Sequence, residues 1–143
     1  MVTFVHTADW QIGKPFGSFA DPERRELLRQ ARFEAIARIG EVVRAHGAAF
    51  VVVAGDLLDS ISVNALTLNR AIHAIGALGV PVLVLPGNHD HGGAGSPWAR
   101  ESFRLEAAAR APNLVVLEEP RPYLDLPGVV VLPCPARRRQ ERE

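Results

Sequence analysis

Three short polar clusters contain the residue types that bind divalent metal ions, and each cluster follows an apolar run. The clusters are residues 6–11 (HTADWQ), 55–59 (GDLLD) and 86–90 (PGNHD). Their carboxylate, amide and imidazole groups suit a hard or borderline divalent cation such as Mn²⁺ rather than a structural zinc bound by thiolates. The clusters therefore indicate metal-assisted chemistry, provided that the fold brings them to one place.

Apolar runs predict the strands that would position these clusters. The runs are residues 2–8, 50–54, 80–85, 114–117, 123–124 and 129–132. The continuous β-branched run at 50–54 is typical of a strand that is buried on both faces. Because the first three runs end at the polar clusters, the candidate chemistry lies at strand ends.

Three helical patterns separate the strands. The first is predicted to begin at residues 21–22, an aspartate cap followed by proline, and to end at 46–47 (HG). The second spans about 63–78, and the third begins at 96–97 (SP). The apolar residues expected to face the core are Leu27, Leu28, Ala31, Ala35, Ile36, Ile39 and Val43 in the first helix, and Trp98, Phe103 and Leu105 in the third.

Alternating strands and helices predict an α/β fold with parallel central strands and right-handed crossovers. In such sheets, ligands collect at the carboxyl ends of the strands. Asp9, Asp56 and Asn88 lie just past three such ends, so their side-chain oxygens can converge on one point. Gly55 and Gly87 would let the backbone turn sharply and bring these short side chains together.

The order of these clusters resembles the motifs of the calcineurin-like metallophosphoesterases, which read D-x-H, then G-D, then G-N-H-D or G-N-H-E. Residues 55–56 and 87–90 match the second and third motifs. Within that superfamily, residues 6–10 (HTADW) and 55–59 resemble the SbcD-type DNA repair exonucleases in particular. The resemblance implies a metallophosphoesterase-type α/β sandwich with α-β-β-α layers. Residues 1–143 would be the N-terminal portion of one such domain, incomplete at its C-terminal side.

The resemblance also implies a role for each motif residue. Asp9 resembles a ligand of the first metal, and Gln11 takes the position of that motif's histidine. Asp56 resembles the carboxylate that bridges both metals, and Asn88 resembles a ligand of the second metal. His89 resembles the catalytic histidine near the leaving oxygen, where it can donate a proton or stabilise charge. Two divalent cations, expected to be Mn²⁺, would complete a phosphodiester-hydrolysing site.

Each of these polar residues also has a structural alternative. Asp9 is a possible turn residue, Asp56 a helix cap, and Asn88 a turn former with a left-handed backbone. The coincidence of all three at strand ends favours the metal interpretation. Asp59 either contacts the metal ligands without binding metal itself or caps the following helix. Asp90 is predicted to be structural and to orient its loop or His89.

The remaining histidines and the single cysteine are predicted to be structural or solvated. His6 is expected to pack within its strand, and His46 and His73 to be solvated or to complement helix dipoles. No role is predicted for His91. Cys134, which excludes an internal disulfide and favours the cytoplasm, is expected to be a buried thiol.

Two departures from the family pattern affect the predicted site. The first motif ends in Gln11, which offers a carbonyl oxygen in place of an imidazole nitrogen, so we expect a weaker first metal site or a different metal preference. Alternatively, Gln11 hydrogen-bonds the phosphate or a metal-bound water. The second departure is that no histidine follows His91, so the two later histidine motifs are absent and a truncated domain is expected.

Composition sets limits on the partners. The chain has 16 basic and 16 acidic residues, so a nucleic-acid partner must be argued from a local site rather than from net charge. The charged run at 137–143 is predicted to be a solvated tail or helix surface rather than a binding patch. No apolar stretch reaches the roughly 20 residues needed to cross a membrane.

The favoured hypothesis is a metal-dependent DNA exonuclease or endonuclease of the SbcD type that acts in DNA repair. By resemblance, its partners would be DNA and an SbcC-type coiled-coil ATPase, with a homodimer of the chain as a further option. The alternatives are a small-molecule phosphodiesterase or phosphatase, and a catalytically silent fragment. A Rossmann nucleotide-binding domain is disfavoured because no G-x-G-x-x-G follows the first strand.

Overall fold

A parallel sheet of four strands forms the centre of the structure, a computed structural model that describes residues 1–138. The strands are β1 (Val5–Thr7), β2 (Val51–Ala54), β3 (Val82–Leu85) and β4 (Leu114–Val116), and they pair in chain order. Of the charged run predicted as a tail, residues 139–143 lie outside the described part of the chain.

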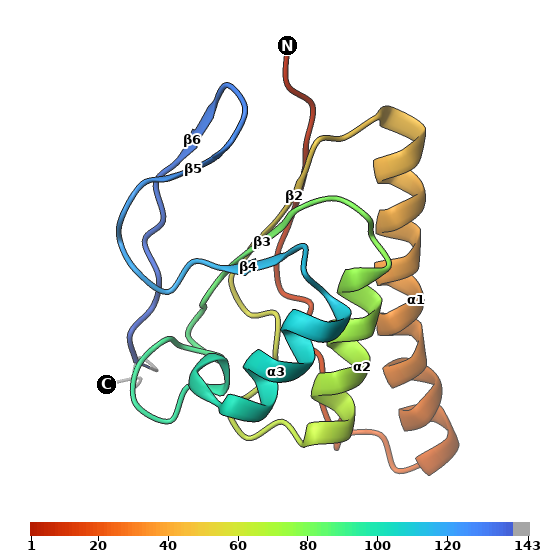
Figure 1. Ribbon diagram of the computed structural model, residues 1–143. Coiled ribbons are helices and arrows are strands. Elements are labelled where there is room, and N and C mark those ends of the chain that lie inside the picture. Colours follow the sequence, from red (N-terminus) through yellow and green to blue (C-terminus); the bar gives the residue numbers. More distant parts are fainter. Residues whose placement is uncertain (139–143) are drawn as a thin grey trace.

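Three helices connect successive strands: α1 (Pro22–His46), α2 (Ala65–Gly76) and α3 (Glu101–Arg110), the last preceded by the short 3₁₀ helix η1 (Pro97–Ala99). Right-handed crossovers that advance in one direction along a sheet place every helix on the same face. Figure 1 shows α1, α2 and α3 together on one side of the sheet.

The opposite face of the sheet is covered by a hairpin of β5 (Tyr123–Leu126) and β6 (Val129–Val131). Here Phe50, Leu83, Leu117 and Leu126 form a second apolar cluster, separate from the larger one under the helices. The described residues therefore form three layers, helices, sheet and hairpin. The predicted α/β class is confirmed.

Local capping explains where the helices begin and end. Asp21 precedes α1 and its Oδ1 accepts a hydrogen bond from the N–H of Glu23 at 2.9 Å, while Gly47 ends the helix at φ 58°. Asn64 caps α2 through an Oδ1 bond from the N–H of Thr67 at 2.9 Å. The predicted start and end of α1 are confirmed.

The predicted inward face of α1 is correct only in its second half. Ile36 and Val43 are buried, whereas Leu27 is 70% exposed and Ala31 and Ala35 are also exposed. The 25 residues of α1 extend about 37 Å, but the strands have three or four residues each and span about 13 Å. The first half of α1 therefore lies beyond the sheet that would have covered it.

The third predicted helix is divided in two. Ser96 caps η1 through Oγ, but Arg100 has an extended backbone with ψ 131°, so α3 begins only at residue 101. Trp98 and Phe103 are buried as predicted, and Leu105 is not, because it lies two residues from Phe103 and thus on the opposite side of α3.

Two further predictions of burial are wrong. His6 is exposed because it lies on the edge strand β1, which contributes no residue to the apolar cluster under the hairpin. Cys134 is exposed because it follows Pro133 in an extended segment, and Pro133 takes the inward position. Among the described residues, no helix is long and apolar enough to cross a membrane.

Candidate functional site

The ends of β1 and β2 lie side by side at the carboxyl edge of the sheet. Beyond the strands, the main-chain N–H of Asp9 donates to the carbonyl oxygen of Gly55 at 3.1 Å, and that of Gln11 donates to the carbonyl oxygen of Asp56 at 2.9 Å. The parallel pairing therefore continues into the two polar clusters. Asp9 is exposed to solvent, whereas Asp56 is 9% exposed.

Three of the predicted ligands hold their main chain in the left-handed region. The φ angles are 55° at Asp9, 44° at Gln11 and 53° at Asp56. Within residues 1–138, Phe16 is the one other residue besides glycine with positive φ. A strained backbone of this kind costs on the order of 1–3 kcal/mol and clusters at functional sites. Strain and candidate chemistry therefore coincide at this edge.

Asp56 also contacts the loop that follows β3. Its Oδ1 accepts a hydrogen bond from the main-chain N–H of His89 at 3.0 Å. A Cβ on Gly87 would lie 2.0 Å from the same oxygen, so this approach requires glycine. Asn88 lies between Gly87 and His89 in the chain and is exposed to solvent. Gly55 makes the expected sharp turn at φ 99°, whereas Gly87 serves close approach rather than a left-handed turn.

Asp90 is fully buried and holds this loop through hydrogen bonds. Its Oδ2 accepts the N–H of Leu58 at 2.9 Å, its Oδ1 accepts the N–H of Gly87 at 2.8 Å, and its carbonyl oxygen accepts the indole N–H of Trp98 at 2.6 Å. Burial raises the pKa of Asp90, the two carboxylate bonds oppose that rise, and the charge of Asp56 adds to it. The predicted structural role is confirmed, and it is exerted on the loop.

The imidazole of His89 is half-buried and anchored by one nitrogen. Its Nδ1 lies 2.8 Å from the main-chain oxygen of Asp59. Because a carbonyl oxygen can only accept, Nδ1 carries the proton, and in the neutral ring Nε2 keeps its lone pair. Within residues 1–138, Nε2 has no hydrogen-bond partner. His89 can therefore present Nε2 to a ligand.

The structural alternatives weighed for three of these residues are wrong. Asn64 caps α2, so neither Asp56 nor Asp59 does. Asn88 has no positive φ, so it is not a left-handed turn former. Asp59 acts through its main chain, since its carboxylate makes no hydrogen bond or ion pair in the described part of the chain.

Within residues 1–138, none of the other histidines has a hydrogen bond or ion pair to the predicted site residues. His46 is exposed as the last residue of α1. His73 is exposed in the last turn of α2, where its Nε2 lies 3.2 Å from Oε1 of Glu106. Nδ1 of His91 accepts the N–H of Gly93 at 3.3 Å.

A sequence model of the family described as calcineurin-like phosphoesterase matches residues 2–133. The chain belongs to this family. Calcineurin-like phosphoesterases are metal-dependent hydrolases of phosphoesters and generally use two divalent metal ions. A comparison with curated proteins found no match. The polar edge of the sheet is therefore the place to look for the phosphoesterase centre.

Gln11 is already engaged by a cation. Its Oε1 accepts a hydrogen bond from Nζ of Lys14 at 2.7 Å. The ammonium group takes the carbonyl oxygen that a metal ion would need, and it adds positive charge beside the edge. Sequence reasoning missed Lys14, although a lysine three residues after the motif, and the chain's only one, was a usable signal.

The remaining donors suit the metal ions of a calcineurin-like phosphoesterase. Asp9, Asp56 and Asn88 offer carboxylate and amide oxygens, which are ligands for hard cations such as Mg²⁺ and Mn²⁺. Among residues 1–138, no three His, Cys, Asp or Glu side chains gather closely enough to hold a metal. The predicted set contains only two residues of those types, so the amide of Asn88 would have to complete it. As placed, Gln11 does not fit.

A hollow of about 600 Å³ opens beside Asn88 on the hairpin side. The chain after β6 returns there, because the N–H of Ala136 donates to the carbonyl oxygen of Pro86 at 3.0 Å. Arg137 and Arg138, the first two residues of the predicted tail, line this hollow together with Asn88. These two arginines therefore contribute to the surroundings of the candidate centre rather than only to a solvated tail.

Proposed function

We propose that this chain hydrolyses phosphodiester bonds in DNA, as an exonuclease or endonuclease of the SbcD type that acts in DNA repair. The observation that carries the proposal is the strained backbone at the carboxyl edge of the sheet. Of the four residues besides glycine that have positive φ within 1–138, three are the ligands expected after β1 and β2. The family match supports the reaction class, and residues 6–10 and 55–59 support the nuclease subfamily.

In this proposal, Asp9, Asp56 and Asn88 hold the metal ions, which we propose to be Mn²⁺. Bound divalent cations supply charge neutralisation of the phosphate and a nucleophile from water at neutral pH. Asp56 would be a ligand common to both cations. His89 would face the leaving oxygen with Nε2, which carries a proton to donate when the ring is cationic, and the carbonyl of Asp59 fixes the orientation of the ring.

By the same resemblance, we propose that the chain works in the cytoplasm as a dimer with an SbcC-type coiled-coil ATPase. A second candidate is a catalytically silent member of the family. The hydrogen bond between Lys14 and Gln11 favours that candidate, because it opposes metal binding at the first position. The two candidates make opposite predictions for hydrolysis.

The test measures Mn²⁺ binding by titration calorimetry and hydrolysis of both a generic phosphodiester and DNA by the full chain. We expect weak binding, with at most one site appreciably occupied at micromolar Mn²⁺, because Gln11 is engaged. Asp56→Ala should abolish both binding and hydrolysis. Asp125→Ala, which removes an exposed carboxylate on β5, is the matched control and should change neither.

Two tight sites in the parent would contradict the predicted weak binding and show that Gln11 is no obstacle. Metal binding without hydrolysis of either substrate would favour the silent candidate. Hydrolysis that survives Asp56→Ala would place the reaction elsewhere on the molecule.

A further inference from the structure

A second concave site lies on the helix side of the same sheet edge. It is a pocket of about 450 Å³ between the first half of α1, the beginning of α2 and the loop at residues 12–15. It exists because α1 extends beyond the short strands and no sheet fills the space beneath it. Its volume lies within the usual range of ligand pockets, about 300–1,000 Å³.

The pocket is strongly cationic although the chain as a whole is neutral. Its charged lining residues are Lys14, Arg29, Arg32, Arg70 and a single acid, Glu26. Arg29 is 3.1 Å from Glu26, but within residues 1–138 no carboxylate lies within 4.0 Å of the other three cations. Three positive charges therefore face this pocket without a neighbouring negative charge to balance them.

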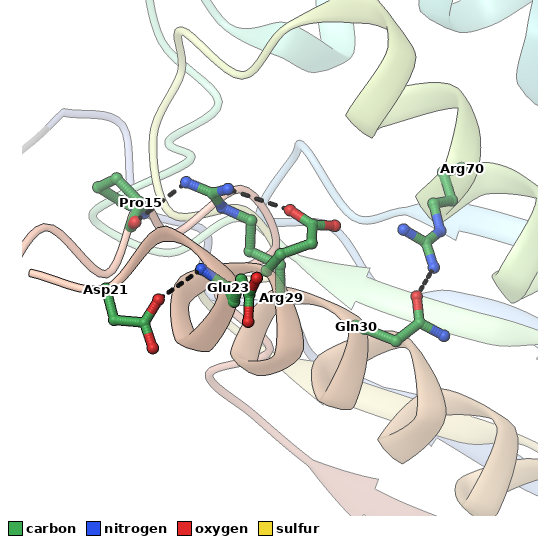
Figure 2. Close-up of polar contacts among 7 residues, drawn as sticks. Pro15, Asp21, Glu23, Arg29, Gln30 and Arg70 are labelled. Atoms are coloured by element: carbon green, nitrogen blue, oxygen red, sulfur yellow. Dashed lines mark hydrogen bonds and ion pairs between the residues drawn. The ribbon is translucent and has the colours of Figure 1, made fainter. Parts of the chain in front are cut away.

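Neutral acceptors hold several of these side chains in place. The Arg29 guanidinium donates to the carbonyl oxygen of Pro15 at 3.1 Å, and that of Arg70 donates to Oε1 of Gln30 on α1. Figure 2 shows both contacts, with Arg29 on α1 and Arg70 reaching across from α2. Arg70 also stacks on Phe33, with its guanidinium carbon 3.9 Å from the ring centroid. The cations are thus oriented before any ligand arrives.

Arg32 is a further cation of the pocket that the protein already holds in place. One terminal nitrogen donates to the carbonyl oxygen of Trp10 at 2.6 Å, and the guanidinium lies 5.1 Å from the ring of Phe16. Its Nε is buried and has no hydrogen-bond partner among the described residues. Because that nitrogen is closed off from solvent, a ligand in the pocket would meet the terminal nitrogens of Arg32 rather than Nε.

The chemistry of these groups selects the ligand. Guanidinium groups present parallel N–H donors that match the oxygens of phosphate, and stacking on an aromatic ring fixes the orientation of the guanidinium plane. Lys14 connects the pocket to the candidate centre, because its Nζ contacts Gln11 while its side chain lines the pocket. We propose that this pocket is a phosphate-binding subsite for a substrate phosphate next to the one that is cleaved. The proposal rests on the proposed phosphodiester substrate.

The test measures binding without metal, so that it does not depend on hydrolysis. A fluorescently labelled, short single-stranded thymidine oligonucleotide is titrated with the full chain in EDTA at several salt concentrations, followed by anisotropy. Arg70→Gln and Lys14→Gln should each weaken binding about tenfold and lower the slope of log affinity against log salt by about 1. Arg38→Gln, an exposed arginine of α1 outside the pocket, is the matched control and should change neither.

A second readout locates the ligand on Arg32. Its Nε–H resonance should shift when the oligonucleotide binds to the parent, and the shift should be reduced in Arg70→Gln. Equal weakening by Arg38→Gln and Arg70→Gln would overturn the proposal, since binding would then be diffuse. A shift of the Arg32 resonance with inorganic phosphate and none with the oligonucleotide would overturn its assignment to the substrate.

Failure of the subsite and failure of the proposed function remain distinguishable. Oligonucleotide binding that depends on Arg70 in a chain without hydrolysis would support the subsite and count against the nuclease. DNA hydrolysis with binding unaffected by Arg70→Gln and Lys14→Gln would overturn the subsite alone. Thermal unfolding of each variant checks that the substitutions leave the fold intact.

Discussion

The two halves of the candidate centre are built in different ways. In the half that follows β2 and β3, the two buried carboxylates make side-chain hydrogen bonds, with Asp90 accepting two main-chain N–H groups and Asp56 accepting the N–H of His89. In the half that follows β1, Asp9 is exposed and both Asp9 and Gln11 have left-handed backbones. The first half is held by side-chain hydrogen bonds, and the second by main-chain hydrogen bonds to the loop after β2.

This difference indicates where the family chemistry is preserved and where it has changed. The half after β2 and β3 keeps the GNHD motif together with hydrogen bonds from Asp56 and Asp90 that hold its loop. The half after β1 has Gln11 where the family has histidine, and Lys14 occupies the amide oxygen. We therefore expect substitutions after β2 and β3 to lower the stability of the fold or the rate of catalysis. One substitution after β1 should raise the affinity for metal.

Among the three substitutions that test this comparison, His89→Ala should have the largest effect, which is on turnover. Loss of a group that transfers a proton lowers the rate by about 10²–10⁴-fold, equivalent to about 3–5 kcal/mol in the barrier. Metal affinity should remain nearly unchanged, because Asn88 supplies the expected ligand. Hydrolysis rate and Mn²⁺ affinity are measured for both proteins. Asp59→Ala is the control, since the main-chain carbonyl that anchors His89 remains; a parent-like rate in His89→Ala would refute the assignment.

An intermediate effect is expected for Asp90→Asn on stability. The amide removes the buried charge but turns an NH₂ group toward one of the two N–H donors, from Leu58 or Gly87, that the carboxylate accepts. One buried donor is left unpaired, at a cost of about 1–3 kcal/mol in the free energy of unfolding. Chemical denaturation measures this cost, with Asp125→Asn on the exposed face of β5 as control. Equal stability of parent and Asp90→Asn would contradict the view that this half is held by hydrogen bonds.

The smallest predicted effect is a gain. Gln11→His restores the family residue and removes the acceptor that binds Lys14, so Mn²⁺ affinity should rise about tenfold, or about 1.4 kcal/mol. Stability should not fall, because histidine is more frequent than glutamine with positive φ. Calorimetry compares Gln11→His with Gln11→Ala, which removes the same acceptor without supplying a ligand. Affinity that rises equally in both would mean that Lys14, rather than the missing imidazole, weakens the site.

The amino-acid sequence determined the fold class, the element order and the three strand-end clusters. These follow from local physics: β-branched runs form strands, and Asp21 and Gly47 bound α1 through their own backbone geometry. The structural role of Asp90 was also predictable, since a carboxylate beside a glycine-rich turn normally accepts main-chain N–H bonds. The ligand roles of Asp9, Gln11, Asp56 and Asn88 stay predictions.

Only the tertiary structure decided which residues meet across the chain. Leu27 was expected in the core, but the first half of α1 extends past the ends of the strands. Leu27 is therefore exposed, and the basic pocket lies beside that half of α1. The engagement of Gln11 by Lys14 and the anchoring of His89 on a carbonyl depend on loop conformations set by pairing between distant segments. Helical and strand periodicity predict which face of an element packs against the core. They do not predict how far the neighbouring elements extend along it. The pocket between α1 and α2 therefore could not be predicted from these patterns.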